Sequence, residues 1–154
     1  MNITSYTSSI NRTGKNTPKI FFVMGNSPTY DQKINGLIGK FNLFSSYLSK
    51  KVSSTVNSLK TVQKTLLEAQ SELKIYENNT NLFDVGNEET RIRSLRKEVT
   101  ILKKQRSKLI TQLKKDFFEY YRSEDDKDNK NFIQKKFSAK WKALDQLKNK
   151  LNSF

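Results

Sequence analysis

The sequence predicts an all-α protein: a long antiparallel helical hairpin that packs like a coiled coil, with a shorter third helix and an extended N-terminal arm. Apolar residues recur every three or four positions through most of residues 31–154, which is the spacing of one helix face. Proline is absent from residues 29–154. Apolar residues make up 34% of the chain and charged residues 29%, a balance that suits elongated helices with a small core.

The first 30 residues are expected to form an extended basic arm. Residues 1–19 contain no acidic side chain and are rich in Ser, Thr and Asn, which compete with regular structure by bonding to the nearby backbone. The apolar run IFFVM at 20–24 predicts a short strand-like anchor within the arm. Ser27 and Pro28 are typical of the N-cap and the first residue of a helix.

Residues 31–154 are predicted to form one helical domain. The apolar spacing places its three helices at about residues 31–77, 88–122 and 131–152. The first of these would be about 70 Å long. Gly36 and Gly39 lower the helix propensity of its first turns.

Two polar segments separate these helices. In the first, ENNTNLFDVGNEE, Asn87 is expected to cap the second helix, with Glu88 and Glu89 at its positive end. The second, SEDDKDNKN, is expected to be a loop. The third helix should then fold back along the aromatic end of the hairpin. Its predicted apolar stripe comprises Ile133, Phe137, Trp141, Leu144, Leu147 or Lys148, Leu151 and Phe154.

The first two helices can be aligned as antiparallel partners, because the numbers of facing apolar residues sum to about 165. This alignment places Leu48 opposite Phe117 and Leu73 opposite Ile92. Arg106 would face Leu59, with its stem on the seam and its charged head in water. The predicted seam comprises Leu48, Val52, Val56, Leu59, Leu66, Leu73, Ile92, Val99, Leu102, Leu109, Leu113 and Phe117.

A parallel homo-oligomeric coiled coil is the competing arrangement. Val52, Leu59, Leu66 and Leu73 also recur every seven residues, as a coiled-coil seam requires. The intramolecular hairpin accounts for both helices and the loop between them, so we favour it as the main seam. The two arrangements are compatible if hairpins associate further.

The net charge of +14 predicts polyanions or acidic surfaces as partners. Residues 91–122 carry eleven basic and three acidic side chains. Five of the six arginines of the chain are among them, and arginine binds phosphate oxygens bidentately. A helix face that is only exposed to solvent would usually carry both positive and negative side chains. The predicted contacts to nucleic acid or an acidic partner are Arg12, Lys15, Lys19, Arg91, Arg93, Arg96, Lys97, Lys103, Lys104, Lys108, Lys115, Lys135, Lys136 and Lys140.

Most catalytic chemistry is not supported by the sequence. The chain has no cysteine and no histidine, which excludes disulfides, thiolate nucleophiles and imidazole catalysis. Gly36 and Gly39 lie too close together for a P-loop, and the acidic segment around Asp126 lacks the ligand pattern of an EF-hand. We therefore expect no enzymatic activity, no catalytic residue, no metal and no cofactor.

These observations favour a non-enzymatic structural or assembly protein of a large complex, such as a virion or a ribonucleoprotein particle, that contacts nucleic acid non-specifically. The alternative is a coiled-coil interaction module or filament-associated protein that docks on an acidic protein surface. Since no signal peptide or transmembrane segment is recognisable, we expect an intracellular (cytoplasmic) or particle-enclosed protein that does not bind membranes and that can form a homo-oligomer. The aromatic residues between 117 and 154 are expected to form core more readily than to stack on bases.

Overall fold

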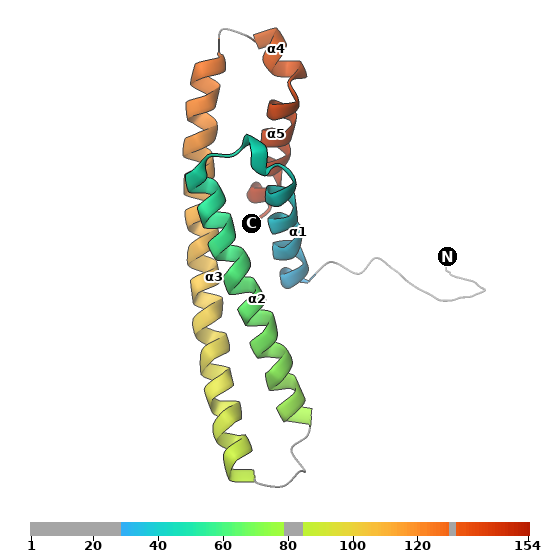
Figure 1. The fold of residues 1–154 in the computed structure, drawn as a ribbon, viewed down its shortest axis with the longest axis vertical. Helices are drawn as coiled ribbons and strands as arrows, with labels where there is room; N and C mark the ends of the chain where they lie inside the picture. The colour runs from blue at the N-terminus through green and yellow to red at the C-terminus, as the bar shows by residue number, and fades with distance from the viewer. Residues whose placement is uncertain (1–28, 79–84, 130–131) are drawn as a thin grey trace, which may run out of the picture. The chain divides into compact units, whose positions relative to one another are not determined.

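A computed structural model describes residues 29–78, 85–129 and 132–154, apart from the side chains of residues 85–88 and 136. The chain divides into two units, residues 1–33 and 34–154. The described residues are almost entirely helical and contain no β-strand (Figure 1). The arm predicted for residues 1–30 and its anchor at 20–24 lie outside the described residues, except for Thr29 and Tyr30.

Helix α1 (Tyr30–Leu43) begins with a capping box. The backbone N–H of Gln32 donates to Thr29 Oγ1 at 3.2 Å, and Gln32 Oε1 accepts from the backbone N–H of Thr29 at 2.9 Å. The two side chains thus satisfy donors that the first helical turn leaves without an intrahelical partner. The predicted cap at Ser27 and Pro28 lies outside the described residues.

The prediction of a single helix over 31–77 is wrong, because the helix is interrupted after α1. A short 3-10 helix, η3 (Ser45–Tyr47), follows, and Leu48 is extended before α2 (Lys50–Asn78) begins. Ser49 caps α2, since its Oγ accepts from the backbone N–H of Val52 at 3.2 Å. The serines at 45, 46 and 49 favour such local hydrogen bonds over an uninterrupted helix.

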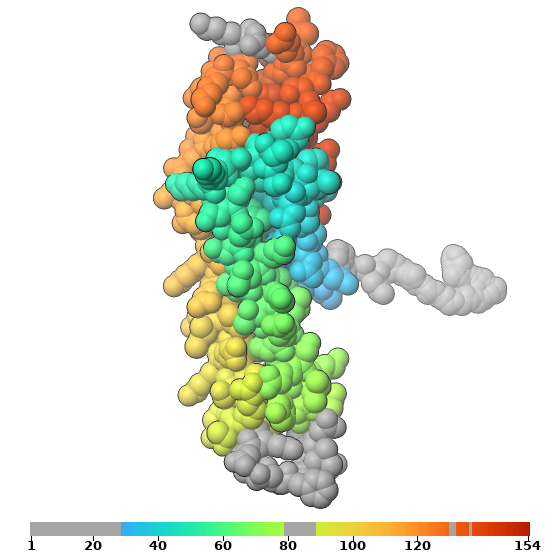
Figure 2. Space-filling model, viewed as in Figure 1, coloured from blue at the N-terminus to red at the C-terminus, as the bar shows by residue number. Residues whose placement is uncertain are grey.

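Helices α2 and α3 (Val85–Asp128) lie side by side in opposite directions, which confirms the predicted helical hairpin (Figure 1). Their side chains are in close contact along the hairpin (Figure 2). Helix α3 begins at Val85, so Asn87 lies within the helix and does not cap it as predicted. The helix also continues past the predicted end at residue 122 to Asp128.

The buried apolar residues of the second unit form two clusters. The main core joins α1, α2, α3 and α5 and comprises Ile34, Leu37, Ile38, Phe41, Val52, Val56, Leu59, Ile110, Leu113, Phe117, Trp141, Leu144, Leu147 and Leu151. The hairpin-end core lies between α2 and α3 alone and comprises Leu66, Ala69, Leu95 and Val99. Seven of the twelve predicted seam residues are buried, and Leu48, Leu73, Ile92, Leu102 and Leu109 are partly buried.

The third predicted helix is also two helices, α4 (Phe132–Phe137) and α5 (Ala139–Asn152). Ser138 separates them because its backbone is extended, with φ −72° and ψ 134°. This break changes the phase of the apolar stripe. Ile133 and Phe137 are therefore exposed, contrary to the prediction, whereas the α5 residues of the stripe from Trp141 to Leu151 are buried in the main core.

Candidate polyanion-binding surface

Five cationic side chains form a line along the outer face of α3. We call this set the α3 stripe, and it consists of Arg93, Lys97, Lys104, Lys108 and Lys115. All five are exposed. On an ideal helix they lie opposite Leu95, Val99 and Leu113, which face α2 in the two cores. The stripe therefore faces away from α2.

The α3 stripe runs through a part of α3 that contains few acidic residues. Within the residues that the structure describes, none of its five side chains forms a salt bridge. The only acidic residue between Arg93 and Lys115 is Glu98, which an ideal helix rotates about 100° away from Lys97. Pairs such as Lys104 and Lys108, four residues apart, repel each other slightly. Charge pairing within α3 therefore does not explain the lysines in the middle of the stripe, Lys104 and Lys108.

Lys103 belongs to the same helix but not to the same line. Its side chain is exposed. An ideal helix rotates it about 100° from Lys104, which places it beside the stripe. Lys103 is therefore available to a partner that wraps around α3, and less so to one that follows the stripe.

Arg91 and Arg96, which the sequence assigned to an external anion, have partners on α2. Arg91 Nη2 lies 2.6 Å from Glu72 Oε2, and Arg96 Nη2 lies 2.8 Å from Glu77 Oε2. The hydrogen bond with Glu72 raises the pKa of Arg91. These two cations connect the helices of the hairpin close to its loop.

Lys135 and Lys140 have acidic partners on α3. Lys140 Nζ lies 2.6 Å from Glu124 Oε1 and 3.3 Å from Asp128 Oδ2, and Lys135 Nζ is paired with Asp125. The hydrogen bond from Lys140 is the largest cause that holds the pKa of Glu124 below its usual value.

This pairing also explains why α3 continues to Asp128. Carboxylates near the C-terminal end of a helix oppose its dipole, so the acids at residues 124, 125 and 128 would be expected to destabilise the last turns. Lysines from α4 and α5 supply the compensating positive charge. The remaining predicted contacts, Arg12, Lys15, Lys19 and the side chain of Lys136, lie outside the described residues.

Arg106 occupies a different environment from the one predicted. Arg106 is only 6% exposed, and its Nη1 donates to Oε1 of buried Gln63 at 2.9 Å. The head of this arginine therefore lies within the seam and not in water. A buried guanidinium needs such acceptors, because an unpaired charge would be costly away from solvent. Nothing in the apolar spacing identified Gln63 as its partner.

Asp116 is a buried carboxylate on the same seam, with a side chain 1% exposed. Thr55 Oγ1 donates to Oδ2 at 2.7 Å, Gln112 Nε2 donates to Oδ1 at 2.8 Å, and Lys51 Nζ lies 3.5 Å from Oδ1. Burial raises the pKa of Asp116, but the hydrogen bonds and the Lys51 charge outweigh it, so the pKa is lowered. These contacts fix the position of α3 against the start of α2.

A pocket of about 350 Å³ lies where α3, α4 and α5 meet, and the sequence did not identify it. We call it the aromatic pocket, and it is lined by Tyr121, Phe132, Lys135, Trp141, Lys142 and Asp145. Tyr121 donates its hydroxyl hydrogen to Asp145 Oδ1 at 2.6 Å. Burial, this hydrogen bond and the carboxylate charge raise the pKa of Tyr121 to about 12.

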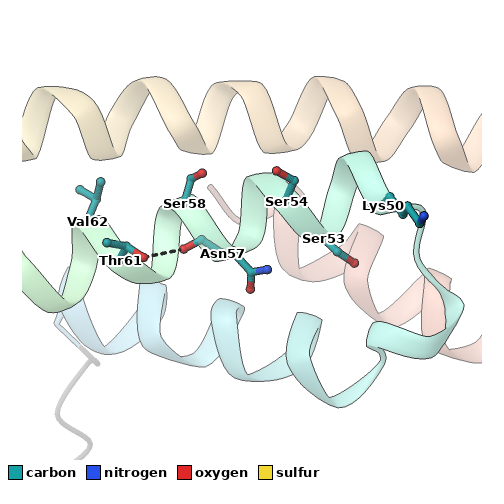
Figure 3. Close-up of a pocket in the computed structure, with 7 residues that line it drawn as sticks. All are labelled: Lys50, Ser53, Ser54, Asn57, Ser58, Thr61 and Val62. Carbon is teal, nitrogen blue, oxygen red and sulfur yellow. Dashed lines mark hydrogen bonds between the residues drawn. The ribbon is translucent and has the colours of Figure 1, made fainter.

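A shallower hollow of about 620 Å³ lies on the outer face of α2, between Lys50 and Val62 (Figure 3). Its lining consists mainly of small neutral side chains, Ser53, Ser54, Asn57, Ser58 and Thr61. Thr61 Oγ1 donates to the backbone carbonyl of Asn57 at 3.1 Å, which is a bond within the helix. This hollow has neither the charge of the α3 stripe nor the rings of the aromatic pocket.

Comparisons with protein-family models, with curated proteins and with solved structures return no match for this chain. None of the described helices combines the length and the apolar composition that crossing a membrane requires. The functional argument therefore rests on the α3 stripe and the aromatic pocket.

Proposed function

We propose that this chain is a non-enzymatic structural component of a large nucleic-acid-containing assembly, and that the α3 stripe contacts the phosphate backbone without regard to sequence. The observation that carries the proposal is the contrast in pairing. Four of the cations expected to bind an anion pair within the chain, whereas the five of the stripe have no described acidic partner. An external polyanion would supply the missing negative charge.

The length of the stripe suits a nucleic-acid backbone. From Arg93 to Lys115 the helix rises about 33 Å, close to one turn of duplex DNA at about 34 to 36 Å. A straight helix that lies along one side of a duplex can contact phosphates where the backbone strands cross that side, without entering a groove. Contacts made only to phosphates give affinity but little sequence specificity. This suits a protein that coats or packages nucleic acid.

A second candidate is docking on an acidic protein surface, and Ile101 favours it. This side chain is 56% exposed and lies four residues after Lys97 and three before Lys104, on the side of α3 that carries the stripe. Phosphates offer no apolar contact to such a residue, whereas protein interfaces combine an apolar centre with a polar rim.

Salt dependence of binding to a duplex of arbitrary sequence tests the proposal. We expect the wild-type chain to bind with a steep negative slope of log affinity against log salt. A variant with Arg93, Lys97 and Lys104 changed to alanine should reduce this slope by about 3, because each phosphate contact contributes about 0.9. The measurement is a fluorescence anisotropy titration at several salt concentrations.

The matched control changes the same amount of charge elsewhere. Lys60, Lys64 and Lys74 are exposed on α2, and their replacement by alanine also removes three positive charges. This control should leave the slope within about 1 of wild type. An equal loss in both variants would show that net charge, and not the stripe, determines binding. Absence of duplex binding together with a stoichiometric complex with an acidic protein would favour the second candidate.

A further inference from the structure

The aromatic pocket has walls from three separate helices. Tyr121 comes from α3, Phe132 from α4 and Trp141 from α5. Its volume of about 350 Å³ lies near the lower limit for ligand sites, which suits one planar group better than a large molecule. Two of the rings form a fixed corner, because Tyr121 and Trp141 meet edge to face, with centroids 5.2 Å apart and planes at 88°.

The corner is held by hydrogen bonds, whereas the third wall is open. Trp141 Nε1 donates to Asp128 Oδ2 at 2.8 Å, and the Tyr121 hydroxyl donates to Asp145. Phe132, in contrast, is 72% exposed. An exposed phenyl ring beside a rigid aromatic corner gains from being covered by a flat apolar surface.

The charge around the rings selects the kind of flat group. Lys142 lines the pocket, is exposed and has no salt bridge to a described residue. Lys148 Nζ lies 5.0 Å from the Tyr121 ring centroid, and Lys135 Nζ lies 4.4 Å from that of Trp141. Lys135 is paired with Asp125, and Asp145 in the lining accepts the Tyr121 hydroxyl hydrogen, so Lys142 is the lining cation without a described acidic partner. This arrangement suits an aromatic group that carries a phosphate, as a nucleotide does.

We propose that the aromatic pocket binds one unstacked base of a single-stranded nucleic acid, with Phe132 as the stacking surface and Lys142 near the adjoining phosphate. This inference rests on the proposed function, because it specifies the form of nucleic acid that the chain prefers. A base within a duplex is stacked on both faces and cannot enter unless it is flipped out. The chain should therefore bind single strands better than duplexes of equal length.

Trp141 is the chain's single tryptophan and lies in the pocket wall, so its fluorescence reports on occupancy. The probes are a short oligothymidylate, an abasic strand with the same number of phosphates, and the corresponding duplex. We expect the oligothymidylate to quench Trp141 and to bind more tightly than the other two. The abasic strand should bind through its phosphates without quenching.

Phe132→Ala and Phe137→Ala form a matched pair. Both residues belong to α4 and they are 72% and 69% exposed, but only Phe132 lines the pocket. Phe132→Ala should weaken oligothymidylate binding about tenfold, as expected for the loss of one stacked base, and should leave duplex binding unchanged. Phe137→Ala should match wild type in both assays.

The outcomes separate the pocket from the stripe. Equal losses in the two phenylalanine variants, or equal affinity and quenching with the abasic strand, would overturn the base-binding pocket. Duplex binding with a stripe-dependent slope would still support the proposed function in that case. If neither single strands nor duplexes bind, the proposed function fails and the pocket assignment fails with it.

Discussion

The two ends of the α2–α3 hairpin differ in the number of helices that pack around their apolar residues. Near the loop, two helices alone enclose the hairpin-end core, so each helix keeps a broad outer face. At the other end, α1 and α5 join them around the main core, and α4 and α5 carry lysines that meet the acids of α3. Ion pairs therefore connect helices at both ends, through Arg91 and Arg96 near the loop and through lysines of α4 and α5 at the other end. The cations of the α3 stripe have no described acidic partner. The presence of an acidic partner, more than the number of basic residues, separates the cations that hold the fold together from those available to an external anion.

The largest expected effect compares the two cores. Phe117 is fully buried and meets Phe41 edge to face, with centroids 5.6 Å apart. Phe117→Ala should lower the free energy of unfolding by about 4 kcal/mol, whereas Leu95→Ala in the hairpin-end core should cost about 2 to 3 kcal/mol. Urea denaturation of both variants measures the two costs.

Two probes distinguish global from local loss of structure in these variants. Trp141 belongs to the main core, whereas far-ultraviolet circular dichroism reports on every helix. Phe117→Ala should shift both transitions together. Leu95→Ala should give an early loss of helical signal before Trp141 changes, because the hairpin end can open by itself. Coincident transitions for Leu95→Ala would show that the two ends unfold as one unit.

The spacing of apolar residues was sufficient to predict the hairpin, because burial of one face on each helix requires that spacing. It was not sufficient for the break at Ser45–Ser49, where local hydrogen bonds of serine compete with a helix that is otherwise well patterned. The helix start at Thr29 has a capping box with Gln32, two residues beyond the cap predicted at Ser27.

The candidate site was less predictable than the fold, because ion pairing depends on tertiary position. Lys140 and Lys104 have the same chemistry, and only the placement of α5 against α3 gives Lys140 its carboxylates. The aromatic pocket likewise depends on the break at Ser138, because Phe132 and Trp141 are nine residues apart and would lie on opposite sides of one continuous helix. No periodicity in the sequence encodes either relationship.

A smaller effect is expected at Asp116, which connects α3 to the start of α2 through buried polar contacts. Asp116→Asn removes the negative charge that Thr55, Gln112 and Lys51 stabilise. The variant should lose about 1 to 3 kcal/mol at neutral pH, the cost of weakening hydrogen bonds to a buried charge. Thermal or urea denaturation of the variant and the wild type measures the difference.

The same variant has an expected pH dependence. The folded-state pKa of Asp116 is lowered, so the ionised carboxylate stabilises the fold above the unfolded pKa of about 3.9. This contribution is lost as the pH falls below that value and through the folded pKa. The stability difference between wild type and Asp116→Asn should therefore shrink below about pH 4. A difference that stays constant down to pH 2 would contradict the assigned pKa.

The smallest effect is expected for the ion pairs, and Lys140→Ala compared with Arg96→Ala tests the contrast between the two ends most directly. The Lys140 side chain is 27% exposed and its partner Glu124 is 15% exposed, whereas Arg96 and Glu77 are 63% and 42% exposed. Lys140→Ala should cost about 1 kcal/mol, and Arg96→Ala at most about 0.5 kcal/mol, because solvent screens the outer pair.

Measurements of duplex binding by Lys140→Ala and Arg96→Ala test whether an ion pair within the chain keeps a cation from binding phosphate. If paired cations serve the fold, neither variant should change the salt slope for duplex binding, although each removes one positive charge. Arg93→Ala in the α3 stripe removes the same charge and should reduce the slope by about 0.9. A reduction of that size in Lys140→Ala would mean that an external phosphate competes successfully with Glu124 and Asp128. The cations of both ends would then belong to one binding surface, and the absence of a described acidic partner would no longer distinguish the stripe.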